Sequence, residues 1–433
     1  MLKRISEHDV NTYLNRHGYR SQFYRVEASR KFRCAVVIPV FNESHYLPRL
    51  LDSITSLDKI RSSDTAFIFV VNNPDTAPPE ILRDNRQSFS LLSGYRCDSE
   101  VFIIDAFSQG RAPEGKNAGV GLARKIGLDA ALSLLDYENK KQPFLVCLDG
   151  DCTVNRGYLT ALHDHYDSGI HDAGVCSYSH IVTGDEENLE AILAYEFYLR
   201  YYSLGLWYAG SPLCYHSIGS TMTFTPELYI KCEGMNKRKA GEDFYFLEKA
   251  AKHTRIPVVY DAVVYPSSRE SERVPFGTGR RIIRHNRNEI NSNMLYDFTT
   301  LEIIRQWQNV TQNFTLSDDP ESVVQSALSI HTGLYEFLNQ NGFFEVINKI
   351  RKNSKTDLQL KKQVSGWMDS FRMLKLIHYI RDHHLPEKPM FGELQRLCNA
   401  IKIEYHAEPG KEAATERRLE LLRLLQGVRI DQI

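Results

Sequence analysis

Hydrophobic residues in the first third of the chain form short continuous runs, separated by stretches with helical spacing. Four of these runs predict buried strands. They cover residues 34–41, 66–73, 101–107 and 144–151. Leucine and isoleucine at helical spacing predict a helix in residues 44–55, after the first strand, and a longer helix is predicted in residues 117–135, before the fourth. Strands that are apolar on both faces and alternate with helices indicate an α/β fold, with a mostly parallel sheet covered by helices on both faces.

The pattern changes beyond about residue 290, where apolar positions recur at helical spacing and no further buried strand is indicated. The amphipathic segments are residues 301–310, 322–338, 343–352, 366–382 and 415–426. They predict an all-helical C-terminal domain. We therefore expect three parts: a helical extension at residues 1–30, an α/β domain at residues 31–290 and the helical domain at residues 291–433.

The composition is that of an ordinary globular protein, with 42% hydrophobic and 25% charged residues among 433, and it excludes disordered and collagen-like chains. A net charge of -1 gives no overall field that would attract nucleic acid, so no nucleic-acid partner is expected. The eight cysteines include no Cys-x-x-Cys pair, which favours a reducing, cytoplasmic setting.

No run of 18 uninterrupted apolar residues is present, so no membrane-spanning helix is expected. The segment nearest to one, residues 191–210, carries Glu196 and Arg200 in its middle, which favours a buried or interfacial helix. A peripheral contact with the inner face of a membrane stays open, as does a homo-oligomer formed through the helical C-terminal domain.

Polar residues directly follow three of the predicted strands. They are Asn42, Glu43 and Ser44 after the first strand, Asn72, Asn73 and Asp75 after the second, and Asp149, Gly150 and Asp151 after the fourth. Ligands of parallel sheets bind beyond the carboxyl ends of the strands. We therefore expect the functional site at this edge of the sheet.

The sharpest of these signals is Asp149-Gly150-Asp151. Two carboxylates at a strand end, with a glycine that lets the backbone bend, can hold a hard divalent cation and leave coordination positions for phosphates. Mn²⁺ or Mg²⁺ is the expected cofactor. The alternative is an ordinary turn, in which the two aspartates cap the next helix.

Four segments occur in a recognisable order over roughly half the chain. They are VVIPVFNE at 36–43, GLARKIGLDAA at 121–131, LDGD at 148–151 and GEDFYFLEKA at 241–250. Together they resemble the GT-A glycosyltransferases, most closely glycosyltransferase family 2, through its first strand, its Ala-Arg-Asn-x-Gly helix, its Asp-x-Asp element and its Glu-Asp motif. The resemblance implies the Rossmann-like GT-A fold for the α/β domain.

The resemblance also implies an inverting enzyme that moves a sugar from a nucleotide-diphosphate sugar to the hydroxyl of a glycan, a lipid-linked acceptor or a small molecule. The donor that it implies is a UDP-sugar. Its pattern places the nucleotide-sugar against Pro39, Phe41, Glu43, Asn73, Arg124 and Asp149, and the metal on Asp149 and Asp151. Asn73 stands where relatives carry an aspartate, which leaves the nucleotide base open. The reaction would serve glycan or polysaccharide synthesis.

By the same pattern Asp243 is the base that takes the acceptor's proton, with Glu242 beside it. The alternative is that Asp243 only caps the helix that follows. The arginine-rich segment at 267–287 could neutralise the donor's phosphates, or it could be a plain basic surface loop. Its candidate arginines are Arg273, Arg280 and Arg281. His285 is a candidate third metal ligand.

Residues 216–235 lie where relatives form the acceptor side, and small residues there would let a sugar approach the backbone. These residues are Gly219, Ser220 and Thr221. Two other functions stay open. A sugar-phosphate nucleotidyltransferase would need a glycine- and arginine-bearing loop after the first strand, which FNESHYL at 41–47 does not offer. A non-catalytic nucleotide-sugar-binding scaffold would be favoured by the loss of a metal or base acid, and none is missing.

Overall fold

The computed structural model describes residues 2–20, 22–115, 118–180, 186–271, 277–405 and 415–429. The chain divides into two units. The sheet unit comprises Met1–Thr183 and Ser217–Arg280, and the helical unit comprises Gly184–His216 and Arg281–Ile433.

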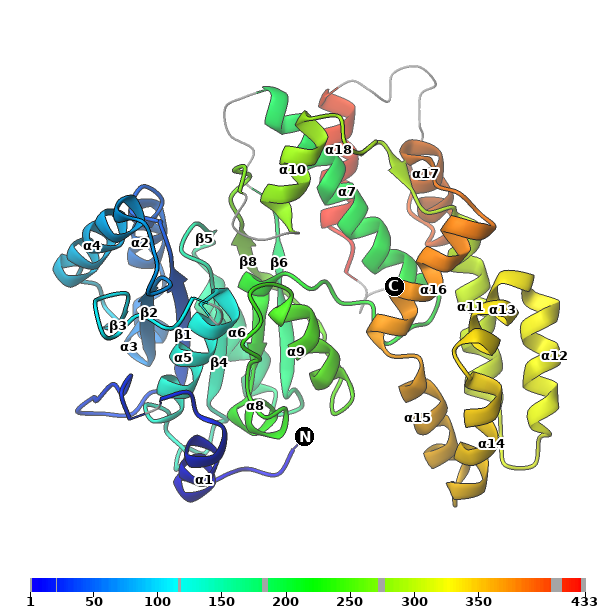
Figure 1. The fold of residues 1–433 in the computed structure, drawn as a ribbon, viewed down its shortest axis with the longest axis horizontal. Helices are drawn as coiled ribbons and strands as arrows, with labels where there is room; N and C mark the ends of the chain where they lie inside the picture. The colour runs from blue at the N-terminus through cyan, green and yellow to red at the C-terminus, as the bar shows by residue number, and fades with distance from the viewer. Residues whose placement is uncertain are drawn as a thin grey trace. The chain divides into compact units, whose positions relative to one another are not determined.

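Four parallel strands form one half of the main sheet (Figure 1). They are β1 (Cys34–Val40), β2 (Thr65–Asn72), β3 (Glu100–Ala106) and β4 (Phe144–Cys147), in the order β3-β2-β1-β4. Every residue of β1, β2 and β4 is buried, as their uninterrupted apolar runs require. These are the four predicted strands, and their parallel pairing confirms the expected α/β fold.

The other half of the sheet is mixed and was not predicted. β7 (Met222–Phe224) pairs antiparallel with β4 and with β6 (Ala173–Tyr178). β8 (Val258–Tyr265) runs parallel to β6, and β5 (Thr153–Val154) pairs antiparallel with β8 at the edge. β5 and β7 have only two and three residues, and β8 alternates buried with more exposed positions, so none of the three forms a long apolar run.

Helices cover both faces of the parallel strands. The helices that lie wholly in the sheet unit are α1 (Glu7–His17), α2 (Leu47–Thr55), α3 (Lys59–Ser63), α4 (Pro79–Gly94), α5 (Val120–Leu132), α6 (Tyr158–Asp167), α8 (Pro226–Lys231) and α9 (Glu242–Ala251), with a short 3-10 turn η1 (Gly219–Thr221). Because side chains alternate along a strand, Val36 and Ile38 pack with α2 and α6 on one face. On the other face α5 comes close to β1, since a Cβ on Gly127 would lie 2.3 Å from Val37 Cγ1.

The helical unit contains α7 (Glu186–Tyr208) and a series of helices after residue 297. These are α11 (Phe298–Asn313), α12 (Pro320–Ile330), α13 (Thr332–Gln340), α14 (Phe343–Asn353), α15 (Asp357–Trp367), α16 (Ser370–His383), α17 (Met390–Ala400) and α18 (Thr415–Gln426). α10 (Thr278–Asn286) includes the residue at which the division falls. A two-residue ribbon, β9 (Met294–Leu295) with β10 (Lys388–Pro389), was not indicated by the sequence.

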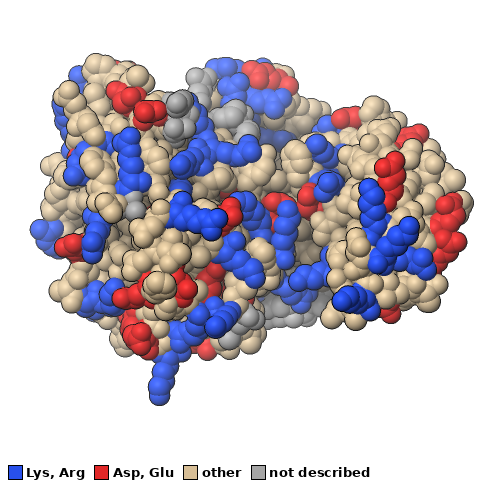
Figure 2. Space-filling model, turned by 60° about the horizontal axis from the view of Figure 1, so that its bottom comes forward, with Lys and Arg blue, Asp and Glu red and all other residues tan. Residues whose placement is uncertain are grey.

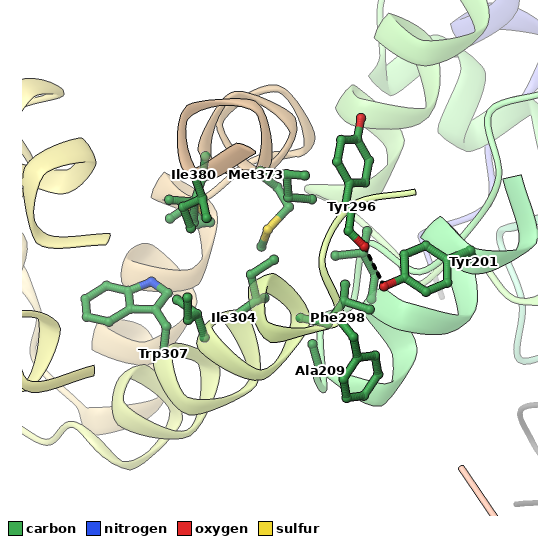
Figure 3. Packing of buried hydrophobic residues seen from close by; sticks show 14 of the residues in the cluster. Tyr201, Ala209, Tyr296, Phe298, Ile304, Trp307, Met373 and Ile380 are labelled. Atoms are coloured by element: carbon green, nitrogen blue, oxygen red, sulfur yellow. Dashed lines mark hydrogen bonds between the residues drawn. The ribbon is translucent and has the colours of Figure 1, made fainter. Parts of the chain in front are cut away.

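A large hydrophobic core holds the helical unit together (Figure 3). Trp307 of α11 is 1% exposed and packs in this core with Met373 and Ile380 of α16. The hydroxyl of Tyr201 donates to the carbonyl oxygen of Tyr296 at 2.8 Å, so this buried polar group is satisfied. The apolar positions of the amphipathic pattern beyond residue 290 therefore lie in the core of the helical unit.

Helix α7 belongs to the helical unit, although the expected α/β domain at 31–290 included it. Its residues Leu193, Phe197 and Tyr201 lie in the same core as the C-terminal helices. The expected boundaries followed the last strand-like pattern in the sequence. Such a pattern cannot show that an inserted helix packs with residues far along the chain.

Glu196 and Arg200, which interrupt the apolar run of α7, form an ion pair at 3.0 Å one helical turn apart. No helix in the described parts of the chain combines the length and the hydrophobicity that crossing a bilayer requires. Figure 2 shows basic and acidic side chains both spread over the face that it presents, in line with the net charge of -1.

Candidate active site

The carboxyl ends of β1 and β4 bring three carboxylates to one edge of the sheet. The two strands pair in parallel, so their ends lie together. A Cβ on Gly150 would lie 3.2 Å from the carbonyl oxygen of Pro39 and 3.3 Å from Glu43 Cγ, so a larger residue there would force its neighbours to shift by a few tenths of an ångström. The side chains of Glu43, Asp151 and Asp149 are 5%, 17% and 34% exposed. The site was expected at this edge of the sheet. We call the turn after β4, residues 149–151, the acidic turn.

Arg124 projects from α5 and joins the acidic turn to the Glu242-Asp243 pair. Its guanidinium is 3% exposed, lies 2.5 Å from Asp149 Oδ1 and forms a second ion pair with Glu242. Glu242 and Asp243 are the first residues of α9, and Glu242 is buried. A Cβ on Gly219 would lie 2.5 Å from both terminal nitrogens of Arg124, so the guanidinium occupies the space that glycine leaves. One buried arginine thus places both predicted acidic elements at one site.

Burial and charge shift the pKa values of this cluster. Burial opposes the charge of Arg124, but Asp149 and Glu242 outweigh it and raise the pKa of the guanidinium above its ordinary value. Burial raises the pKa of Glu242, which Arg124 counteracts and Asp243 reinforces. Burial also raises the pKa of Asp243, and Arg124 again opposes the shift. The two carboxyl groups therefore bind a proton at higher pH than exposed acids do.

Asp243 is the more exposed member of the acidic pair. Its Oδ1 accepts a hydrogen bond from the backbone N–H of Phe244 at 2.7 Å. It lies in the first turn of α9, where the helix dipole favours a negative charge. Glu242, by contrast, is buried against Arg124. Asp243 is therefore the carboxylate of the pair that can meet a substrate.

Arg269 is a residue of the site that the sequence did not reveal. Its Nη2 lies 2.5 Å from Glu43 Oε1 and 2.8 Å from Asp151 Oδ2. Its guanidinium carbon lies 4.1 Å from the centroid of the Tyr46 ring. Arg269 and Glu43 are 226 positions apart in the sequence, so only the fold shows that they meet. Its place inside the arginine-rich segment 267–287 was the one available signal.

Asp149 and Asp151 have the chemistry to hold a hard divalent cation. Mg²⁺ and Mn²⁺ prefer carboxylate oxygens and often take only one or two of them, with phosphates and water completing the shell. Each carboxylate is engaged by a guanidinium, Asp149 by Arg124 and Asp151 by Arg269. Across the described residues, no group of three or more His, Cys, Asp or Glu side chains is arranged to hold a metal. The donor set thus fits a metal that arrives with a phosphate ligand, and its binding stays a prediction.

A network of amides holds the ends of β1 and β2. Asn85 of α4 donates to the carbonyl oxygen of Asn72 at 3.0 Å and to Asn73 Oδ1 at 2.8 Å, and it accepts from the N–H of Asn42 at 3.1 Å. Asn73 is 1% exposed and donates in turn to two backbone carbonyls. The amide of Asn73 is therefore hydrogen-bonded inside the protein, and its contact with a nucleotide stays a prediction.

Phosphate binding by the three arginines predicted in segment 267–287 stays a prediction. Arg273 lies outside the described residues. Arg280 belongs to the sheet unit, whereas Arg281 and His285 belong to the helical unit. The guanidinium carbon of Arg281 lies 4.6 Å from the centroid of the Tyr198 ring. Arg269, from the same segment, contacts the acidic turn instead.

The residues predicted on the acceptor side are buried in η1. Ser220 is 1% exposed and Thr221 is 0% exposed. The hydroxyl of Thr221 donates to the carbonyl oxygen of Ile218 at 2.7 Å. Their contact with an acceptor stays a prediction, as does nucleotide binding by Pro39, which is buried in β1, and by Phe41, which is partly exposed just beyond it.

A buried network positions the helix that carries Arg124. Lys125 Nζ lies 3.2 Å from Asp129 Oδ2, one turn along α5. The hydroxyls of Tyr13, from α1, and Tyr229, from α8, donate to Asp129 Oδ1 at 3.0 and 2.9 Å. The N-terminal helix and α8 therefore hold α5 in place, and a network of this kind is invisible in the sequence.

Comparison with known proteins gives three findings. Residues 35–224 match the family model described as Glycosyl transferase family 2. Curated protein sequences give no match. Among solved structures the chain resembles S. aureus TarS 1-349 in complex with UDP-GlcNAc, at 15% identity and a TM-score of 0.38 over 81% of this chain and 92% of that one. It also resembles the mannosyltransferase PcManGT from Pyrobaculum calidifontis in complex with GDP-Man and Mn²⁺, at 12% identity and a TM-score of 0.34 over 97% and 94%.

We draw no conclusion from structural likenesses at these TM-scores. The family match begins in β1 and ends at β7, so it includes Glu43, Arg124 and the acidic turn. Glu242 and Asp243 follow it and are joined to it by the ion pair of Arg124. On the family match, the sheet that it covers and the acids at its edge, this chain is a glycosyltransferase of the GT-A fold whose residues 35–224 are similar to glycosyltransferase family 2.

Proposed function

We propose that this glycosyltransferase moves a sugar from a nucleotide-diphosphate sugar to a hydroxyl acceptor, with a divalent metal and with inversion at the anomeric carbon. The observation that carries the proposal is the double ion pair of Arg124 with Asp149 and Glu242. It joins the carboxylates suited to a metal and diphosphate to the pair suited to remove a proton. A sugar-transfer site needs both within the length of one sugar.

On the donor side, Asp149 and Asp151 would hold Mn²⁺ or Mg²⁺. When bound, the metal neutralises charge that develops on the departing diphosphate. Glu43 lies at the same edge, where it can face the nucleotide part of the donor. The family resemblance implies uridine as the nucleotide, so a UDP-sugar is the first donor to test.

On the acceptor side, Asp243 would remove the proton of the attacking hydroxyl. Its exposure, its place at the start of α9 and a pKa raised above that of an exposed aspartate suit a general base. Attack from the face opposite the departing diphosphate inverts the anomeric carbon. Glu242 would keep Arg124 in place rather than exchange protons with the acceptor.

A panel of nucleotide sugars, each with and without Mn²⁺, tests this proposal. At least one is expected to raise the unfolding temperature of the protein and to release its nucleoside diphosphate, in both cases only when Mn²⁺ is present. NMR of the product formed on a simple sugar acceptor should then show the anomeric configuration opposite to that of the donor. A complete panel that neither stabilises the protein nor releases nucleoside diphosphate would contradict the proposal, and retention would contradict the inverting step.

A further inference from the structure

The guanidinium of Arg269 occupies the space between Glu43 and Asp151. It contacts both carboxylates, at 2.5 and 2.8 Å, and only 17% of its side chain is exposed. The ring of Tyr46 covers it at 4.1 Å. Two carboxylates this close and this shielded from water repel each other unless a cation lies between them. Arg269 supplies that cation from within the chain.

One of these two carboxylates, Asp151, is also a ligand of the metal in the proposed function. A divalent cation on Asp151 must approach the carboxylate that Arg269 holds at 2.8 Å. Two cations cannot share this position without strong repulsion, because the site is only partly open to water. Metal binding therefore requires that Arg269 leave Asp151.

We propose that Arg269 is the resident counter-ion of the acidic turn, that it exchanges with the divalent metal, and that its guanidinium then pairs with the diphosphate of the donor. The inference rests on the proposed function, because it takes the metal and the diphosphate from there. It adds a specific role for a residue that neither the sequence nor the family match singles out.

Because of this exchange, the metal and the nucleotide should each raise the protein's affinity for the other. Metal alone must displace Arg269 from Asp151, so the guanidinium loses one of its two carboxylate partners. When a diphosphate is present, the displaced guanidinium gains a bidentate anionic partner. Coupling between two ligands is reciprocal, and couplings of this kind are typically about 5- to 150-fold in affinity.

The test measures Mn²⁺ binding, through the electron paramagnetic resonance signal of unbound Mn²⁺, with and without UDP. In the wild-type protein Mn²⁺ alone is expected to bind weakly, and UDP to tighten its binding by about tenfold or more. The variant Arg269→Gln should bind Mn²⁺ alone about tenfold more tightly than the wild type, and UDP should tighten its Mn²⁺ binding by a smaller factor than in the wild type. Arg49→Gln, which removes an exposed arginine of α2, is the matched control and should behave as the wild type.

Arg269→Lys keeps the positive charge but cannot bridge two carboxylates as a guanidinium does. It should bind Mn²⁺ with intermediate affinity, and it serves in place of Arg269→Gln if that variant does not fold. A crystal structure with UDP and Mn²⁺ gives a second readout, in which Arg269 should contact the β-phosphate and no longer Asp151.

Two results would overturn the inference. One is a wild-type affinity for Mn²⁺ alone in the Arg269 variants. The other is a UDP and Mn²⁺ complex in which Arg269 still bridges Glu43 and Asp151. Either result could occur while the wild-type protein still releases nucleoside diphosphate in the presence of Mn²⁺, and the proposed function would then stand. Failure of the nucleotide-sugar panel itself would instead remove the proposed function.

Discussion

Arg124 is shared by carboxylates from two distant parts of the chain, the turn after β4 and the start of α9. Removing one partner of a buried ion pair typically costs about 3 to 5 kcal/mol, because the other charge is left uncompensated. Lysine would keep the charge but lose the fork that reaches two carboxylates. This residue therefore determines the positions of both halves of the site.

The raised pKa of Asp243 makes opposite predictions for activity and stability. The base must be ionised, so transfer should be lost as pH falls through the raised pKa, at a higher pH than an exposed aspartate would give. A carboxyl whose pKa is raised by folding stabilises the fold while it is protonated, and this contribution is lost as pH rises through that pKa. The variant Asp243→Asn should therefore unfold at a higher temperature than the wild type at pH 8, and the difference should shrink in acid.

Thermal unfolding and transfer rate, each followed between pH 4 and about 8, check this prediction in the range where carboxyl groups with raised pKa values titrate. Asp52→Asn removes an exposed carboxylate of α2 and is the control. Its unfolding temperature should equal that of the wild type at both ends of the pH range. An Asp243→Asn protein less stable than the wild type at pH 8 would contradict the assigned environment of Asp243.

At the scale of elements, the side chain of Arg124 reaches from α5 to η1 and fills the space beside Gly219. A Cβ on Gly219 would lie 2.5 Å from the guanidinium nitrogens of Arg124. The variant Gly219→Ala should therefore push Arg124 away from Asp149 and Glu242, and transfer should fall by about 100-fold, as misplacement of a catalytic site by about 1 Å can cost. The rate of transfer under saturating donor, together with the unfolding temperature, measures this effect.

Gly94→Ala is the matched control, because a Cβ there would meet nothing within 4 Å. It should retain the wild-type rate. A Gly219→Ala enzyme with the wild-type rate would show that transfer does not depend on the present position of the Arg124 guanidinium.

The elements differ in how far the sequence could predict them. β1, β2 and β4 are buried on both faces, so their apolar runs are visible without any knowledge of their neighbours. β7 has three residues and takes its place from its partners on either side, which no local pattern records.

The same contrast holds for the site. Asp149, Asp151 and Asp243 were predicted because they belong to local motifs at element ends. Arg269 was not predicted, because its role depends on a contact with Glu43 that only the folded sheet creates. Asn73 was given a nucleotide-binding role because it stands where relatives carry an aspartate, and the sequence could not show that its amide is bonded to Asn85 and to backbone carbonyls.

At the scale of the whole molecule, the chain combines a sheet unit that carries the site with a helical unit that has its own core. The family match ends at residue 224, and most of the helical unit follows it. Acceptor binding, self-association and membrane contact through this unit stay predictions. The activity proposed here rests on the sheet unit, which contains Glu43, Asp149, Asp151 and Asp243.

In the proposed site, Asp149 and Asp151 hold the metal and the donor, and Asp243 removes the acceptor's proton. Isothermal titration of the nucleotide-sugar that the panel identifies, with Mn²⁺, into Asp151→Asn and Asp243→Asn proteins tests this division of roles most directly when combined with transfer rates. Asp151→Asn should lose metal-dependent donor binding. Asp243→Asn should bind the donor with the wild-type affinity and yet transfer at least about 100-fold more slowly, as expected for loss of a general base. Wild-type transfer by both variants, or loss of donor binding in Asp243→Asn alone, would contradict this division.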